Sequence, residues 1–210
     1  MVAIDVGHSY AKPGAVSARG VPEFDFNLRL AQAVAGELEK QGIAVKLIGA
    51  DGKADDLYAR APQADGTRLL LSIHHDSVQE KYLRPWRFRG EERRYTTHAL
   101  GHALFISSRN PQEARSLGCA ASIGRALSGL PIARHHVDPA TGKPRPWADY
   151  AAGVHYYDNL VVLRTATVPA VLLEAGVILN RKEEHLLAQE AYRQKLAGAI
   201  AQGASRCIGN

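Results

Sequence analysis

The stretch LLLSIHHDS, residues 69–77, decides the fold that we expect for this chain. An apolar run of this length that ends in polar residues is typical of a buried strand. In an open α/β sheet, the residues just beyond the carboxyl end of a strand line the ligand crevice. His74 and His75 lie at this point, and the two cannot both continue the buried pattern because strand side chains alternate between faces. The stretch therefore predicts either a functional histidine or a hydrogen-bonded histidine pair that caps the strand.

A second strand is expected near the start of the chain, where VAIDVG, residues 2–7, is followed by His8. Between the two strands, apolar residues at helical spacing predict a helix: Phe24, Leu28, Ala31, Ala35 and Leu38. Glu23 stands just before this helix, and Gly42 ends it. A glutamate at a helix entrance is usually a dipole partner or a cap. Because Glu23 is expected to lie beside His8, a functional role is the alternative interpretation.

Composition bounds the class of protein. With 210 residues, of which 46% are hydrophobic, the chain can form one domain with a sizeable core, and we assign residues 1–210 to a single domain. No apolar stretch approaches the roughly 20 residues that cross a bilayer. The net charge of +5 favours anionic partners, cell-wall polymer or nucleic acid, without selecting between them. Cys119 and Cys207 either form one bridge or remain two thiols.

Strands and helices alternate through the rest of the chain. We expect further strands at residues 45–49, 102–107, 160–164 and 170–175, one or two helical turns at 55–61, and helices capped by Asn110 and Asn180. Residues 81–97 are rich in arginine and aromatic residues and indicate an exposed excursion, and the polar segment 133–153 indicates a functional or disordered loop. The pattern predicts an α/β fold with a mostly parallel, mixed, open twisted sheet of about six strands and helices on both faces.

Glu174 is a charged residue inside the apolar run VLLEAGV. An unpaired carboxylate is costly to bury, so it needs compensation. One interpretation pairs Glu174 with Arg164, and the other makes it a catalytic carboxylate that faces a metal-activated water. Together with His8, Glu23 and His74, it gives two histidines, one glutamate ligand and a second glutamate. That is the composition of a zinc site with an open fourth position and a general base.

Four motifs in chain order carry a resemblance to a known family. They are IDVGH at residues 4–8, Glu23 followed by Asp25, Asn27 and Leu28, SIHHD at 72–76, and LR at 163–164 followed by VPAVLLEAG at 168–176. In these motifs the chain resembles the zinc-dependent N-acetylmuramoyl-L-alanine amidases of the type 3 amidase family, which are bacterial cell-wall hydrolases. The chain departs from the family pattern at His75, in the loop SYAKPGA and at residues 175–177. These departures concern the substrate subsite, and none of them removes an expected metal ligand.

The resemblance implies one zinc ion per chain, held by His8, Glu23 and His74. It implies hydrolysis of the amide bond between N-acetylmuramic acid and L-alanine in peptidoglycan, with Glu174 as the group that moves protons. Arg164 is a further catalytic candidate, for an oxyanion or a substrate carboxylate, with a structural pair to Glu174 as the alternative. The remaining candidates for contact with substrate or metal are His75, His135, His136 and Trp86.

The resemblance also implies a periplasmic, cell-envelope or secreted location, and we expect that a signal peptide has been removed from this chain. Peptidoglycan is the expected partner, and the need for an activator protein stays open. We expect a monomer without a membrane span. We further expect the excursion at residues 80–98 to form a wall of the substrate groove, with Trp86 or Tyr95 on a sugar ring, and a solvated surface loop is the alternative.

Three other functions remain open from the sequence. A silent peptidoglycan-binding module would not need Glu174 together with a complete ligand set. A nucleic-acid binder is suggested by RPWRFRGEERR, residues 84–94, but Glu91 and Glu92 interrupt the basic run, and we expect no nucleic-acid partner. Another zinc amide hydrolase, such as a carboxypeptidase, is the nearest chemical rival, and the identity of the product distinguishes it.

Overall fold

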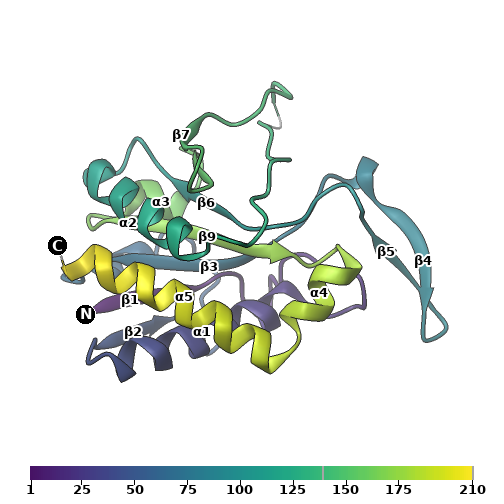
Figure 1. The fold of residues 1–210 in the computed structure, drawn as a ribbon, viewed down its shortest axis with the longest axis horizontal. Coiled ribbons are helices and arrows are strands. Elements are labelled where there is room, and N and C mark those ends of the chain that lie inside the picture. Colours follow the sequence, from purple (N-terminus) through teal and green to yellow (C-terminus); the bar gives the residue numbers. More distant parts are fainter. Residues whose placement is uncertain (139, 210) are drawn as a thin grey trace.

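A seven-stranded sheet forms the centre of the molecule (Figure 1), in a computed structural model that describes residues 1–138 and 140–209. Pro139, inside the predicted long loop, and Asn210, at the end of the predicted single domain, lie outside the described residues. The strand order is β2-β1-β3-β9-β6-β8-β7. The strands are β1 Val2–Val6, β2 Val45–Ile48, β3 Leu70–Asp76, β6 Ala103–Ile106, β7 Trp147–Asp149, β8 Val154–Tyr156 and β9 Ala170–Val177.

The sheet is mixed and mostly parallel, as predicted. Strands β2, β1, β3 and β9 run parallel to one another, as do β6 and β8. The antiparallel pairs are β6 with β9 and β7 with β8. The predicted α/β class is therefore confirmed. The short strands β7 and β8 were not predicted, because the polar and turn-forming residues around them resemble a loop.

The long helices pack on one face of the sheet, and only short segments cover the other among the described residues (Figure 1). Helices α1 Glu23–Lys40, α2 Glu113–Ala126 and α5 Glu190–Gly209 share one apolar core with Leu69, Leu71 and Ile73 of the β3 segment, and α4 Arg181–Leu187 precedes α5. Helix α3 Val161–Thr165 and the 3₁₀ turn η1 Ala61–Ala64 pack against the face that carries Leu70. The described helices include none that is long and apolar enough to cross a membrane.

Residues 160–164 were predicted to be a strand, and this prediction is wrong because they contribute to helix α3. Strand β9 already pairs with β3 on one side and β6 on the other, so it offers no free edge to a further strand. Val162 and Leu163 instead bury their side chains against the face of the sheet. The apolar run thus reflects burial, and tertiary packing decides its conformation.

The predicted excursion at residues 81–97 is largely a hairpin, with η2 Glu80–Tyr82 before it. Strands β4 Arg84–Phe88 and β5 Glu91–Tyr95 pair antiparallel and project from one end of the molecule (Figure 1). The predicted helical turns at 55–61 are turns that lead into η1.

The two predicted helix caps differ in outcome. The Asn180 side chain accepts hydrogen bonds from the backbone of Lys182 and Glu183 at the start of α4, which confirms the cap. The Asn110 side chain accepts a hydrogen bond from the backbone of Gln112, but α2 begins only at Glu113. Its amide also donates to the carbonyls of Leu163, Ala166 and Val168, so it ties the α3 loop to the start of α2.

Helices α2 and α5 cross closely, and a disulfide joins them. A Cβ atom on Gly203 would lie 2.5 Å from the Cα atom of Ile123, so the crossing requires glycine there. Cys119 on α2 is bonded to Cys207 on α5, with 4.9 Å between their Cα atoms and 88 residues between them in sequence. The structure thus favours the bridge over the two thiols that the sequence left as the alternative.

Replacing both Cys119 and Cys207 by Ala should lower the free energy of unfolding by about 2–4 kcal/mol, because the bond restricts the unfolded chain over a long separation. Urea denaturation of the variant, and of the wild-type protein with and without reductant, measures this loss. Two titratable thiols in unreduced, denatured protein from an oxidising compartment would contradict the prediction.

Candidate active site

Three predicted metal ligands meet at the carboxyl ends of β1 and β3. His8 follows β1, His74 belongs to β3, and Glu23 is the first residue of α1. Glu23 Oε1 lies 3.0 Å from His8 Nε2 and 3.1 Å from His74 Nδ1, and one ligand atom from each residue lies within 4.8 Å of the others. Neighbouring ligands of a tetrahedral zinc ion with bonds near 2.05 Å are about 3.3 Å apart. The donor types and their spacing therefore fit zinc.

Hydrogen bonds hold Glu23 as a carboxylate in this position. Its side chain is buried, and burial alone would raise its pKa, but hydrogen bonds and charge from His74 and His8 bring the pKa well below its ordinary value. The second oxygen accepts from the backbone of Ala15 at 3.1 Å. The side-chain amide of Asn27 donates to Glu23 Oε1 and to the carbonyl of Gly7. Glu23 is thus fixed from both sides and remains charged.

A buried ion pair shapes the chain around His8. Arg60 donates through Nη1 to Asp5 at 2.5 Å and to the carbonyl of Val6, and through Nη2 to the carbonyl of His8 at 2.5 Å. His8 has a positive φ of 69°, a conformation that costs a non-glycine residue of order 1–3 kcal/mol. Ser72 donates to the other oxygen of Asp5. The sequence patterns did not single out Asp5 and Arg60, although a charge inside VAIDVG was the available signal.

Gly7 leaves room for the imidazole of His74. A Cβ atom on Gly7 would lie 2.4 Å from two atoms of the His74 ring and 2.6 Å from Nδ1. These contacts are too close for any side chain, so the ring would have to move. The glycine before His8 is therefore required by the other histidine ligand, on the neighbouring strand.

Glu174 lies beside the three ligands. It is the register partner of His74 on β9, so both side chains point to the same face of the sheet. Its Oε2 atom is buried and has no hydrogen-bond partner among the described residues. Burial raises the pKa of Glu174 well above its ordinary value, and the charges of Asp76 and Glu23 add to the shift. Such a carboxyl can accept and release protons nearer neutral pH than an exposed glutamate.

Arg164 does not pair with Glu174. Its guanidinium, at the end of α3, donates to the hydroxyl of Tyr58 at 3.0 Å in an exposed contact. The proposed structural pair is therefore not formed. Arg164 does not line the cleft described next, although Val161 and Val162 of the same helix do.

A cleft of about 270 Å³ opens beside the ligands. Its walls include the two ligands His8 and His74, loop residues 54–57 and residues 160–162 at the start of α3. The cleft lies on the face that the long helices leave free, so a ligand could reach the metal-binding side chains from this side. The hairpin β4–β5 contributes no residue to its lining.

His75 points to the opposite face, as strand alternation requires. Its Nδ1 lies 2.8 Å from Asn27 Oδ1, and its ring packs on Phe26. Because the Asn27 amide nitrogen already donates elsewhere, Nδ1 of His75 is the donor in this contact. Burial lowers the pKa of His75 to about 3, so the ring is neutral. The structure does not bring His75 to the cleft, and its contacts hold Asn27 instead.

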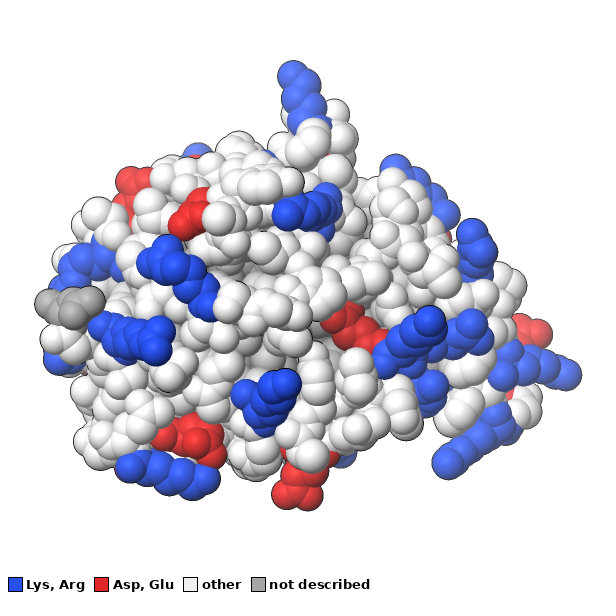
Figure 2. Space-filling view, viewed as in Figure 1, with Lys and Arg blue, Asp and Glu red and all other residues white. Residues whose placement is uncertain are grey.

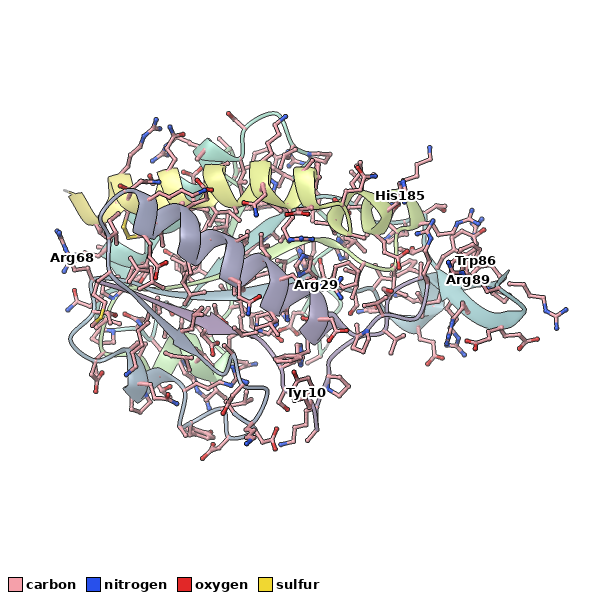
Figure 3. All side chains as sticks on the ribbon, turned by 90° about the horizontal axis from the view of Figure 1, so that it is seen from below. Tyr10, Arg29, Arg68, Trp86, Arg89 and His185 are labelled. Carbon is pink, nitrogen blue, oxygen red and sulfur yellow. A yellow bond between two sulfur atoms is a disulfide. The ribbon has the colours of Figure 1, made fainter. Side chains whose placement is uncertain are left out.

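The other two substrate-binding candidates do not belong to the ligand trio. His136 lies with His135 beside Asp76, at the end of β3, and burial lowers the pKa of His136 to about 4. Trp86 lies on the projecting hairpin (Figure 3), where its indole donates to the carbonyl of Ala18 and the Arg181 guanidinium lies 4.9 Å from the ring centroid. The structure therefore gives Trp86 protein partners and does not place it in the cleft.

Comparisons with known proteins agree with this geometry. A family model described as N-acetylmuramoyl-L-alanine amidase matches residues 2–206. The N-acetylmuramoyl-L-alanine amidase AmiA of Escherichia coli K12 is 29% identical, over 97% of this chain and 74% of that protein.

Two solved structures show similar folds. The catalytic domain of CwlV, an N-acetylmuramoyl-L-alanine amidase from Bacillus (Paenibacillus) polymyxa var. colistinus, has a TM-score of 0.72 and 27% identity over 98% of this chain and 96% of that one. The CwlD amidase from Clostridioides difficile, solved in complex with the GerS lipoprotein, has a TM-score of 0.69 and 20% identity over 99% and 98% of the two chains. At that identity, the second likeness concerns the fold alone.

Arg60→Ala should lower the free energy of unfolding by about 3–5 kcal/mol, because it leaves the Asp5 carboxylate buried without its partner. It should also weaken binding of added zinc by the group His8, Glu23 and His74, since the His8 carbonyl loses its donor. Arg68→Ala is the matched control: Arg68 is exposed, and its loss should change the free energy by no more than about 0.5 kcal/mol. Chemical denaturation and metal analysis give both values, and equal behaviour of the two variants would refute the role of Arg60.

Proposed function

This chain belongs to the type 3 family of N-acetylmuramoyl-L-alanine amidases and is a peptidoglycan amidase, and we propose that it works with zinc held by His8, Glu23 and His74 and with Glu174 as its general base. The observation that carries the proposal is the convergence of His8, Glu23 and His74 from three separate segments, with Glu174 on β9 in register with His74. The bond cleaved would be the amide between the lactyl group of N-acetylmuramic acid and L-alanine.

Zinc, when bound by these residues, would supply a Lewis acid that polarises the scissile carbonyl and makes water more acidic. Glu174 would accept a proton as the water oxygen attacks the carbonyl carbon. When the C–N bond breaks, Glu174 would return that proton to the nitrogen of L-alanine. The products are a lactyl carboxylate on the glycan and a stem peptide with a free amino group. The raised pKa of Glu174 suits a group that both takes and gives the proton.

The basic surface at the hairpin end supports an anionic polymer as substrate. Lysine and arginine side chains gather at this end of the molecule (Figure 2), and Arg84, Arg87, Arg89 and Arg94 of the hairpin are exposed. Trp86 and Tyr95 lie on the face of the hairpin opposite to Arg87 and Arg94, close to the guanidinium of Arg181. The hairpin would therefore attract peptidoglycan by charge, outside the cleft itself.

The cell envelope is the location that fits this activity. The disulfide between Cys119 and Cys207 is compatible with an oxidising compartment. An accessory protein remains a proposal, supported by the lipoprotein in the complex of the CwlD amidase. The monomeric state also remains a prediction.

Glu174→Gln should bind zinc normally but lose about 10²–10⁴-fold in turnover, because the amide keeps the shape of the side chain and cannot accept a proton. Glu23→Gln should instead retain zinc poorly. Mass spectrometry of the products from a defined muropeptide measures turnover and identifies the bond, and wild-type enzyme should release the intact stem peptide with L-alanine at its amino terminus.

Both variants must first be shown to fold, by thermal melting with excess zinc. Near wild-type turnover by zinc-loaded Glu174→Gln would remove the general base from the mechanism. Release of a carboxyl-terminal amino acid from the stem peptide by the wild-type enzyme would instead support a carboxypeptidase.

Reversing two exposed charges of the hairpin, Arg87→Glu with Arg89→Glu, should weaken binding to insoluble peptidoglycan by roughly tenfold. Hydrolysis of a small soluble muropeptide should stay unchanged, because neither residue lines the cleft. Arg68→Glu is the control, since Arg68 is exposed at the opposite end of the molecule from Arg89 (Figure 3). Equal polymer binding by the double variant and wild type, in a pull-down at low salt, would exclude this role.

A further inference from the structure

A second group of metal-binding side chains lies next to the active site. Asp76 Oδ2 lies 3.1 Å from His135 Nε2 and 3.3 Å from His136 Nε2, and one ligand atom from each residue lies within 4.8 Å of the others. These separations match the distance of about 3.3 Å between neighbouring ligands of a tetrahedral site. The group, here the Asp76 cluster, shares no residue with His8, Glu23 and His74.

Hydrogen bonds within the protein do not satisfy the Asp76 cluster. Asp76 is 9% exposed, and its Oδ2 atom is buried without a hydrogen-bond partner among residues 1–138 and 140–209. His136 Nε2 is also buried without such a partner, so its contact with Asp76 lacks hydrogen-bond geometry. His135 Nε2 has one alternative use, a long contact of 3.3 Å to the carbonyl of Ser77. Buried polar atoms without partners are costly, and here they converge on one point.

The surrounding charges favour a cation at that point. Asp76 and Glu174 are close enough for the charge of each to act on the other, and Glu183 acts on Asp76 and His135 from the start of α4. Arg145 lies near His136, but it is turned towards Asp138 and the ring of Tyr157. Asp76 thus contacts both imidazoles, two further carboxyl groups lie within range of its charge, and the neighbouring guanidinium does not pair with it among the described residues.

Strand geometry separates the Asp76 cluster from the first ligand group. His74 and Asp76 are two residues apart on β3, so they point to the same face with roughly 7 Å between their Cα atoms. His135 and His136 come from the long segment between α2 and β7. A ligand held by the Asp76 cluster would join this segment to the end of the central strand.

We propose that the Asp76 cluster binds a second divalent transition-metal ion, beyond the zinc held by His8, Glu23 and His74. Two imidazoles and one carboxylate select zinc or a similar ion over magnesium and calcium, which prefer oxygen ligands. The ion fastens the segment with His135 and His136 to the end of β3, beside Glu174. The protein then carries two metal ions per chain.

Zinc titration of the EDTA-treated full chain tests this proposal, with calorimetry and elemental analysis after gel filtration as readouts. Wild-type protein should bind two zinc ions per chain. The double variant His135→Ala with His136→Ala should bind one, and so should His74→Ala, because each loses a different site. A variant with all three changes should bind none. His185→Ala is the control for surface histidines, since His185 is exposed on α4 (Figure 3), and it should bind two.

Asp76→Asn provides a second test that preserves the size of the side chain. It should also bind one zinc ion, which decides the matter if the double histidine variant fails to fold. A wild-type stoichiometry of one that is lost in His74→Ala would overturn the second site and leave the first intact. Two zinc ions retained by Asp76→Asn would overturn the assignment of Asp76. If the His74→Ala variant retained two zinc ions, this result would contradict the site formed by His8, Glu23 and His74 but not the Asp76 cluster.

Discussion

The buried ion pair between Asp5 and Arg60 is the contact on which the active-site edge depends. Arg60 bonds to one carboxylate oxygen and to the carbonyls of Val6, His8 and Ala54, and so it holds the chain where β1 ends. This turn gives His8 its left-handed conformation and aims its ring at Glu23. A buried charge pair is weak support for stability in general, but removing one partner is costly. The pair is therefore best understood as a device that fixes geometry.

The register of the parallel strands supplies the other half of the site. Pairing of β1 with β3 brings Gly7 against His74, and pairing of β3 with β9 sets Glu174 opposite His74. Just beyond this point, β9 carries one extra residue relative to β3, because Asp76 pairs with Val177. Bulges of this kind often lie next to active sites, where they change the direction of side chains. One face of the sheet thus presents two groups of metal-binding residues, and the long helices cover the opposite face.

The sequence predicted those parts of the site that depend on local pattern. Alternation along β3 indicated that His74 and His75 point to different faces, although His75 was kept as a substrate candidate and in the structure packs against Phe26 and Asn27. The trio His8, Glu23 and His74 came from the ordered motifs and the family resemblance that they carry. Arg60 could not be found in this way, because its partner is 55 residues away and only the fold joins them. The same holds for Asp76, which meets His135 from a segment that the sequence showed only as a long loop. The strand prediction for residues 160–164 was wrong for a related reason. The apolar pattern indicates burial, whereas the conformation is decided by β9, whose two edges are already paired.

Acidic residues gather on the metal-binding face of the sheet. Glu174 lies close enough to Asp76 and Glu23 for their negative charges to oppose its ionisation. Bound cations would offset this repulsion, but until they bind, the scaffold alone must hold the carboxylates together. The disulfide between α2 and α5 and the close crossing at Gly203 lie on the opposite face of the sheet. Stabilising contacts are thus placed where they do not obstruct the cleft, and the metal-binding face can keep polar atoms unsatisfied until ligands arrive.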